Sequence, residues 1–136
     1  MKFVIDTNII IAALVKDSFA RKIILLGDAE FISPDFSIDE INKYKELILN
    51  KSGMTEKEFT ILLSTLLERI NIIPEFRYES YLEEANKLIG NIDLKDVPFI
   101  ALALSMENDG IWSEDKHFQK QGKVKIWKTE EIKDMV

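Results

Sequence analysis

The feature that most constrains this chain is a regular alternation of short apolar runs with longer stretches of helical pattern. The runs cover residues 2–5, 30–33, 71–74, 110–113 and 124–127, and each is followed by a charged residue or a proline. Strands that alternate with helices form a mostly parallel sheet with helices on both faces. We therefore predict an α/β fold with three layers, α/β/α.

The stretches between these runs repeat apolar residues at helical spacing. The spacing predicts helices over 9–15, from Phe19 to Leu26, from about 38, over 59–67, from 81 to Gly90, from 96 or 97 to about 106, and after Thr129. A short helical piece is expected between the last two strands. No repeat, linker or low-complexity segment interrupts the pattern, so we expect one domain over residues 1–136.

Composition limits the chemistry that such a domain can perform. The chain has no cysteine and a single histidine, His117. Disulfides, thiolate zinc sites, thiol nucleophiles and multi-histidine metal centres are excluded, and a Ser-His-Asp triad has one candidate base. Any chemistry must run mainly on carboxylates, hydroxyls, lysines and arginines.

No targeting or membrane segment is visible. The N-terminal apolar run is interrupted at Asp6, too early for a signal peptide, and no stretch approaches the roughly 18 apolar residues of a membrane span. We expect a soluble, cytoplasmic protein that makes no membrane contact.

The formal net charge of −6 argues against a nucleic-acid partner, because phosphates are repelled at long range. An acidic surface is more simply explained by solubility. Two features weaken the objection. Carboxylates that converge on bound cations invert the local field, and the segment from Lys116 to Lys128 holds five lysines and no acid.

Four acidic residues are expected near one edge of the sheet. Asp6 directly follows the first strand, and Glu40 lies in the first turn of the helix after the second. Asp115 follows the fourth strand, and Asp96 reaches the same edge from the start of the preceding helix. In sheets of this kind, ligands bind beyond the carboxyl ends of the strands.

Each acid also has a structural explanation. Ser37 and Glu40 form a capping-box pattern, S-x-x-E. Asp96 and Asp115 are each suited to cap a helix, and Asp6 suits the turn after its strand. Capping does not explain why Asp6 should lie close to the run Ile9-Ile10-Ile11, where its side chain should be largely buried. A buried carboxylate without a partner is costly.

Bound metal resolves this cost. Four acids at one edge would repel one another and raise one another's pKa values unless cations neutralised them, and Arg21 is the one arginine near these segments. Oxygen ligands favour Mg²⁺ or Mn²⁺ over zinc or copper, and such ions activate water against a phosphate. The sequence predicts phosphodiester hydrolysis with Asp6, Glu40, Asp96 and Asp115 as metal ligands and catalytic residues.

Four blocks of sequence together resemble the PIN-domain family of metal-dependent nucleases. They are FVIDTNIIIAAL at the start, SIDEI at 37–41, DVPFIALAL at 96–104 and IWSEDKHF at 111–118, in the family's order. The resemblance implies a five-stranded, mostly parallel sheet and Mg²⁺- or Mn²⁺-dependent cleavage of RNA. The family often forms dimers, so the resemblance also implies a homodimer. Many members are the toxin ribonucleases of toxin–antitoxin pairs, and whether this chain has a small antitoxin protein as a partner stays open.

The resemblance carries the family's acidic quartet onto the four acids already named. Asn8 matches an asparagine that helps to order the site, and Ser113 stands where the family has a threonine or serine near the metal. We expect Thr7 and Asn8 to cap the following helix and to orient Asp6.

Two of the acids have neighbours that compete for the assignment. Asp93 lies three residues before Asp96, which is preferred because it is in register with the apolar face of its helix. Asp93 is kept as an extra acid. Glu114 adjoins Asp115, which is preferred because Phe118 follows it at the expected spacing.

Other side chains give candidate contacts. Arg21, Lys116 and Lys120 are candidate RNA-binding residues, although an ordinary solvated face explains the lysines equally well. The two tryptophans are expected in the core or at an interface. The histidine is expected at the surface or on a phosphate rather than as a general base, and the apolar helix over 59–67 is expected to be core with a part in a dimer contact.

Competing functions have weaker support. Phosphatases with an aspartate after the first strand need Asp-x-Asp, and this chain has Asp6-Thr7-Asn8. Receiver domains need an acidic pair just upstream, which is absent. The remaining alternative is a catalytically weak PIN-like domain that binds RNA or a protein, and the presence of all four acids argues against it.

Overall fold

A parallel sheet forms the centre of the molecule. The computed structural model describes residues 1–135, so Val136, the end of the expected domain, lies outside the described residues. The strands are β1 (Lys2–Ile5), β2 (Glu30–Pro34), β3 (Ile70–Ile73), β4 (Ile111–Trp112) and β5 (Ile126–Trp127). They lie in the order β3-β2-β1-β4-β5, and every neighbouring pair is parallel. The predicted five-stranded α/β fold is confirmed, with a sheet that is wholly parallel.

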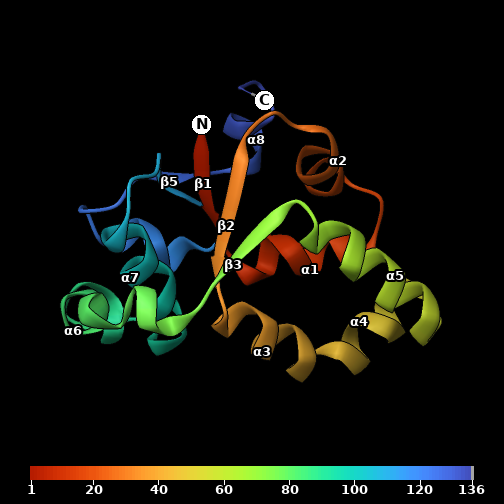
Figure 1. The fold of residues 1–136 in the computed structure, drawn as a ribbon, viewed down its shortest axis with the longest axis horizontal. Coiled ribbons are helices and arrows are strands. Elements are labelled where there is room, and N and C mark those ends of the chain that lie inside the picture. Colours follow the sequence, from red (N-terminus) through yellow and green to blue (C-terminus); the bar gives the residue numbers. More distant parts are fainter. Residues whose placement is uncertain (136) are drawn as a thin grey trace.

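Helices cover both faces of this sheet (Figure 1). One core contains Phe3 and Ile5 together with α1 (Thr7–Val15), α2 (Phe19–Leu26), α5 (Glu56–Leu67) and α8 (Thr129–Ile132). The other contains Val4 and Ile32 together with α6 (Leu82–Ala85) and α7 (Val97–Ser105). Successive side chains of a strand point to opposite faces, which divides β1 between the two cores. The three-layer prediction is therefore confirmed.

The helix predicted from about residue 38 is two helices. α3 (Phe36–Lys43) begins two residues earlier than expected, and α4 (Lys45–Ser52) follows after Tyr44. The backbone of Tyr44, with φ −99° and ψ 12°, leaves helical geometry at that point. Ile41 and Ile48 are both buried, so the shared apolar face was predicted correctly. Both helices pack against α1, as Figure 1 shows below the sheet.

The segment between β3 and β4 is less regular than its apolar spacing predicts. Short 3₁₀ turns cover Glu75–Arg77 and Glu79–Tyr81, and α6 continues into a π-helical turn at Asn86–Gly90. A further 3₁₀ turn, Leu94–Asp96, leads directly into α7. The short helical piece predicted between the last two strands is the 3₁₀ segment η5 (Lys116–Lys120).

The order of the strands determines where a ligand crevice can form. The chain adds β2 and β3 on one side of β1 and then returns to add β4 and β5 on the other side. The strand order therefore reverses between β1 and β4, and crevices in parallel sheets open at the carboxyl ends of such strands. There the backbone N–H of Asp6 donates to the Trp112 carbonyl at 3.1 Å. Among residues 1–135, no helix has the length and apolar character needed to cross a bilayer.

Candidate metal centre

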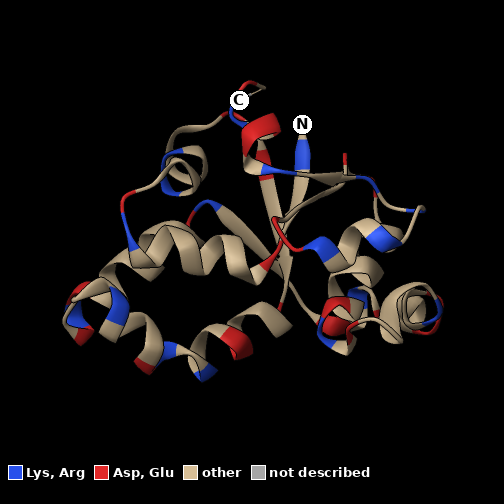
Figure 2. Ribbon diagram, turned by 180° about the vertical axis from the view of Figure 1, so that it is seen from behind, with Lys and Arg blue, Asp and Glu red and all other residues tan. Residues whose placement is uncertain are grey.

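A small crevice of about 210 Å³ opens where β1 and β4 end. In Figure 2 acidic residues (red) gather near the centre, where the strands give way to helices. The four predicted acids converge on this crevice together with the extra acid, so five carboxylates line it: Asp6, Glu40, Asp93, Asp96 and Asp115. Residues up to 109 positions apart in the sequence meet there because parallel strands end at one edge.

Asp6 stands at the centre of the crevice. Its side chain is only 4% exposed, as its isoleucine neighbours predict, and its Oδ2 accepts a 2.7 Å hydrogen bond from the Ser113 hydroxyl. Burial raises the pKa of Asp6 to about 6, the Ser113 bond opposes this rise, and the negative charges of Asp115 and Glu40 add to it. A positive charge nearby would therefore stabilise the deprotonated form of Asp6.

Asp96 has the least satisfied carboxyl group. It is 5% exposed, and its buried Oδ2 has no hydrogen-bond partner among residues 1–135. Burial and then the charges of the four other acids raise the pKa of Asp96 to about 8. It occupies the N-cap position of α7, but its side chain makes no capping bond. The helix-cap explanation fails for Asp96, and an unpartnered oxygen amid carboxylates fits a metal ligand.

Glu40 is fixed by α1 rather than by its own helix. Its Oε1 accepts a 2.6 Å hydrogen bond from the Thr7 hydroxyl, and burial raises the pKa of Glu40. The capping-box reading is wrong because Ser37 lies inside α3 and donates to the Pro34 carbonyl. Thr7 orients Glu40 and not Asp6, which corrects the role expected for it. Asn8 is exposed and lines the crevice.

His117 lies beside two of the crevice carboxylates, Asp93 and Asp115. The Asp115 backbone N–H donates to the Ser113 hydroxyl, so Ser113 links Asp115 to Asp6. His117 Nδ1 lies 3.2 Å from Asp93 Oδ2 and 3.5 Å from Asp115 Oδ1. Asp115 also caps η5 by accepting from the His117 backbone N–H, so its capping explanation holds alongside the functional one.

The ligand atoms that come together most closely differ from the predicted quartet. Asp93, Asp96, Asp115 and His117 each offer an atom within 4.8 Å of the others, whereas Asp6 and Glu40 line the rest of the crevice. The sequence reading kept Asp93 only as an extra acid and left His117 outside the metal site. Neither its spacing nor its residue type distinguished His117, because contact with Asp93 depends on the fold of the loop before α7.

Four further side chains considered from the sequence lie outside the crevice, and two of them have other partners. Arg21 donates to the Ala13 and Leu14 carbonyls, which completes the last turn of α1, and it does not line the crevice. Glu114 accepts from the backbone N–H of Thr129 and so holds the start of α8, which supports the choice of Asp115. Lys116 and Lys120 are exposed on η5.

The sequence reading missed a cation at the rim of the crevice. Lys95 lines it and donates to the Tyr44 hydroxyl at 3.3 Å. Its charge lowers the pKa of Glu40, against the larger effect of burial. The position of Lys95 directly before Asp96 was the available signal, because any residue next to a ligand in a helical turn lies near the site.

A parallel α/β sheet whose carboxylates gather at its switch point defines a class of proteins in which this edge can hold a metal ion. The family is then identified by comparison: the PIN domain profile matches residues 4–135, and the chain belongs to the PIN domain family. The acidic cluster is consistent with a metal-dependent nuclease. No curated protein matches the chain.

Ser113 provides a test of how the crevice is organised. Changing Ser113→Ala removes the hydroxyl that both lowers the pKa of Asp6 and holds Asp115. We expect Mn²⁺ binding, measured by calorimetry near neutral pH, to weaken by roughly 10- to 100-fold, the usual loss when a group that orients a ligand is removed.

The matched control is Ser105→Ala, because the Ser105 hydroxyl donates only to the Leu102 carbonyl within α7. That variant should bind Mn²⁺ like the parent protein. Equal affinities in the parent and both variants would show that Ser113 does not organise a metal site.

Proposed function

We propose that this PIN domain is a metal-dependent endoribonuclease that hydrolyses RNA phosphodiester bonds in the crevice between β1 and β4. The observation that supports it most is the buried Asp96 Oδ2, which lacks a protein partner among residues 1–135 while four other carboxylates face the same space. A site built in this way is costly for a protein unless cations occupy it.

The chemistry of the donor set favours Mg²⁺ or Mn²⁺ as the cofactor. Asp6, Glu40, Asp96 and Asp115 supply carboxylate oxygens, and Asp93 and His117 add a carboxylate and an imidazole. Bound ions of this kind supply an activated water and neutralise charge on the attacked phosphate. The protein's part is orientation: Ser113 holds Asp6 and Thr7 holds Glu40.

RNA as the substrate is supported by positive charge around an acidic centre. Lys95 lies at the rim of the crevice, and Lys116 and Lys120 are exposed on η5, the segment that follows Asp115. Lysines of this kind hold phosphates as point charges. Arg21 is engaged with α1 carbonyls, which makes it a weaker candidate for an RNA contact than Lys95.

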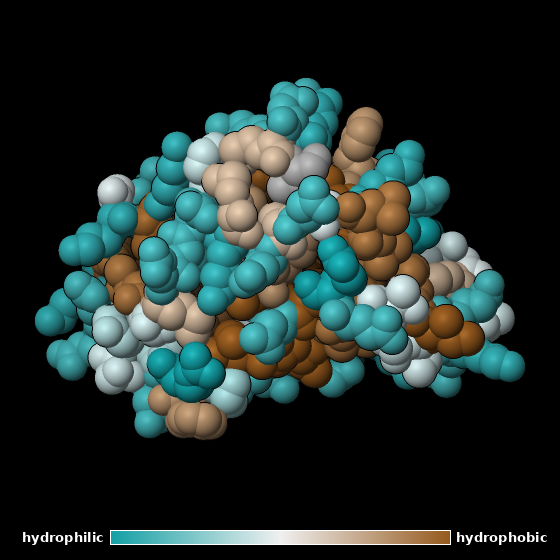
Figure 3. All heavy atoms as spheres, turned by 45° about the horizontal axis from the view of Figure 1, so that its top comes forward, coloured by the Kyte–Doolittle hydropathy of each residue, from teal (hydrophilic) through white to brown (hydrophobic). Residues whose placement is uncertain are grey.

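A homodimer and a small antitoxin partner belong to the same proposal. Exposed apolar side chains are spread over several elements, among them Phe19 and Leu26 on α2 and Ile61 on α5. Figure 3 shows hydrophobic residues (brown) breaking through the hydrophilic surface in separate places on one face. Apolar residues scattered singly are normal on a protein surface, so these partners are proposed from the chain's membership of the PIN domain family.

The test is cleavage of labelled single-stranded RNA, duplex RNA and single-stranded DNA by purified protein with Mn²⁺, with Mg²⁺ or with chelator. We expect RNA to be cut with either ion and not with chelator. Cleavage that persists in chelator, or metal-dependent cleavage of DNA in preference to RNA, would contradict the proposal.

A further inference from the structure

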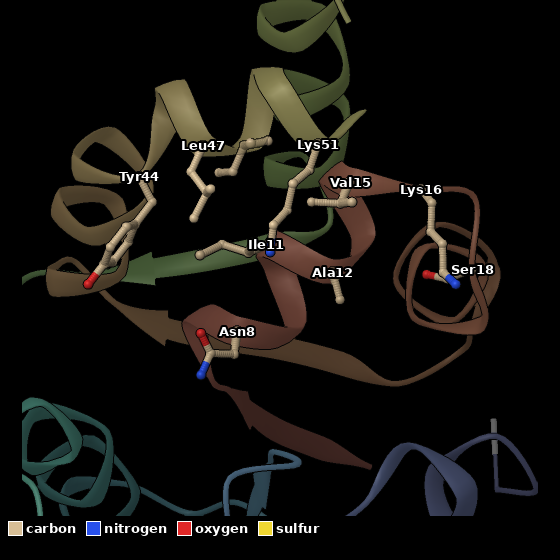
Figure 4. Close-up of a pocket in the computed structure, with 10 residues that line it drawn as sticks. Asn8, Ile11, Ala12, Val15, Lys16, Ser18, Tyr44, Leu47 and Lys51 are labelled. Atoms are coloured by element: carbon tan, nitrogen blue, oxygen red, sulfur yellow. The ribbon is translucent and has the colours of Figure 1, made fainter. Parts of the chain in front are cut away.

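A second, mostly apolar groove adjoins the metal centre. It has a volume of about 440 Å³, within the range of ligand sites, and it runs between α1 and α4. Asn8 and Tyr44 line both this groove and the acidic crevice, so the two spaces lie next to each other. Figure 4 shows Leu47 and Lys51 projecting from α4 toward Ile11 on α1, with Tyr44 and Asn8 on the left of the view.

The walls of the groove suit the face of a flat ring. Ile11, Val15 and Leu47 supply aliphatic surface, and Leu47 is 49% exposed. Tyr44 contributes an aromatic ring whose hydroxyl is held by Lys95. Aromatic and aliphatic walls of this kind receive nucleobases with little regard to base identity.

The far end of the groove is positively charged. Lys16 and Lys51 line it, and both are exposed. From Asn8 to Lys16 the groove follows α1 for eight residues, about 12 Å of helix. An acidic protein thus places two cations at the end opposite its carboxylates, which complements a phosphate and not a second acidic group.

We propose that this groove is a subsite for one unpaired base of the RNA substrate, next to the scissile phosphate, with a neighbouring phosphate near Lys16 and Lys51. The inference rests on the proposed ribonuclease function. A base stacked inside a duplex cannot enter the groove without leaving its helix. The groove therefore makes the protein selective for single-stranded RNA.

The decisive experiment pairs a change in the RNA with a change in the protein. A single-stranded oligoribonucleotide and versions with one abasic ribose at successive positions are bound to protein carrying Asp6→Asn, so that cleavage does not interfere. Affinity is measured by fluorescence anisotropy with Mn²⁺, with and without Leu47→Glu. We expect one abasic position to weaken binding by roughly 5- to 100-fold, the usual contribution of one stacked base.

In protein that also carries Leu47→Glu, the same abasic change should not weaken RNA binding further, because the charged side chain already prevents the base from binding in the groove. Ile61→Glu is the matched control, since Ile61 is 58% exposed on α5 and does not line the groove. Its abasic profile should match that of the parent. Leu47→Ala replaces the glutamate variant if the latter is not folded.

Two outcomes would overturn the base subsite. One is an abasic penalty of the same size with and without Leu47→Glu, and the other is the absence of a penalty at every position, which would leave the groove to a protein partner. Failure of the ribonuclease proposal itself is separate, because it would be recorded as a lack of metal-dependent cleavage by the parent protein.

The lysines provide a second readout. Each phosphate contact on single-stranded RNA contributes roughly 0.7 to the slope of log affinity against log salt. We expect Lys16→Ala and Lys51→Ala each to reduce that slope by about this amount, and Lys57→Ala, an exposed lysine of α5, to leave it unchanged. Unchanged slopes in the Lys16→Ala and Lys51→Ala variants would contradict the proposed contact between these lysines and an RNA phosphate.

Discussion

Replacing Asp6→Asn should abolish metal-dependent cleavage while making the metal-free protein more stable. Loss of a metal ligand removes several kcal/mol of charge stabilisation from the reaction, so we expect the rate of RNA cleavage with Mn²⁺ to fall roughly 1,000-fold or more. The measurement is the initial rate of cleavage at saturating Mn²⁺.

The gain in stability has a different physical origin. Burial raises the pKa of Asp6 to about 6, so above that pH the metal-free fold must hold a buried negative charge. Asparagine has the same shape, can accept the Ser113 hydrogen bond and carries no charge. At pH 7.5 and with chelator, the free energy of unfolding should rise by on the order of 2 kcal/mol.

Asp28→Asn is the matched control, because Asp28 is exposed and lies outside the crevice. It should change neither activity nor stability. If Asp6→Asn destabilised the metal-free protein, the carboxylate would be satisfied by the protein itself and would have no need of a cation. If the variant cleaved RNA at the parent rate, the activity would come from a contaminant.

Much of the fold follows from local patterns in the sequence. β1, β2 and α2 lie where their apolar spacing predicts, because short runs ended by charged residues or glycine leave few alternatives. The break at Tyr44 was not predicted. Ile41 and Ile48 continue one apolar face across the break, and the departure from helical geometry depends on how α3 and α4 fit against α1.

The convergence of side chains on the crevice could be predicted for residues that directly follow a strand. It could not be predicted for residues whose contact depends on how the connecting segments fold. Asp6 and Asp115 follow β1 and β4, so their convergence follows from parallel topology. Glu40 lines the crevice, but its capping pattern with Ser37 is not used, whereas Thr55 and Glu58 do form a capping box. Sequence spacing cannot tell a used cap from an unused one.

The contact between Asp93 and His117 shows the limit of spacing arguments. Asp93 precedes the 3₁₀ turn at Leu94–Asp96, His117 lies in η5, 24 positions away, and no local rule brings them together. The acidic quartet drew attention because its members share a residue type and a place relative to strands. A histidine in a lysine-rich segment shares neither, so its place beside two carboxylates became visible only in three dimensions.

The free energy of unfolding should fall with rising pH in the metal-free protein and should not fall when metal is bound. In the metal-free protein, Asp6 and Asp96 have pKa values of about 6 and about 8, above the ordinary value of 3.8 in the unfolded chain. Between about pH 4 and pH 8 the folded state therefore binds more protons than the unfolded state. The free energy of unfolding must fall as the pH rises through that window.

Saturating Mn²⁺ should reverse this trend, because the cation takes the place of the protons on the same carboxylates. We expect the rise in Tm on adding Mn²⁺ to be small at pH 5 and to grow toward pH 8. There an ion at 1,000 times its Kd adds about 4 kcal/mol, on the order of 10 °C or more for a domain of this size. Thermal melts across pH, with Mn²⁺ or chelator, measure both effects.

Asp96→Asn should flatten both curves, because it removes the group with the more strongly raised pKa and a candidate ligand together. Asp28→Asn should leave both curves as they are in the parent. A metal-free protein that becomes more stable between pH 5 and pH 8 would mean that the five carboxylates are stabilised as anions within the fold. The cost that the cations are proposed to relieve would then not exist, and the crevice would have no physical requirement for metal.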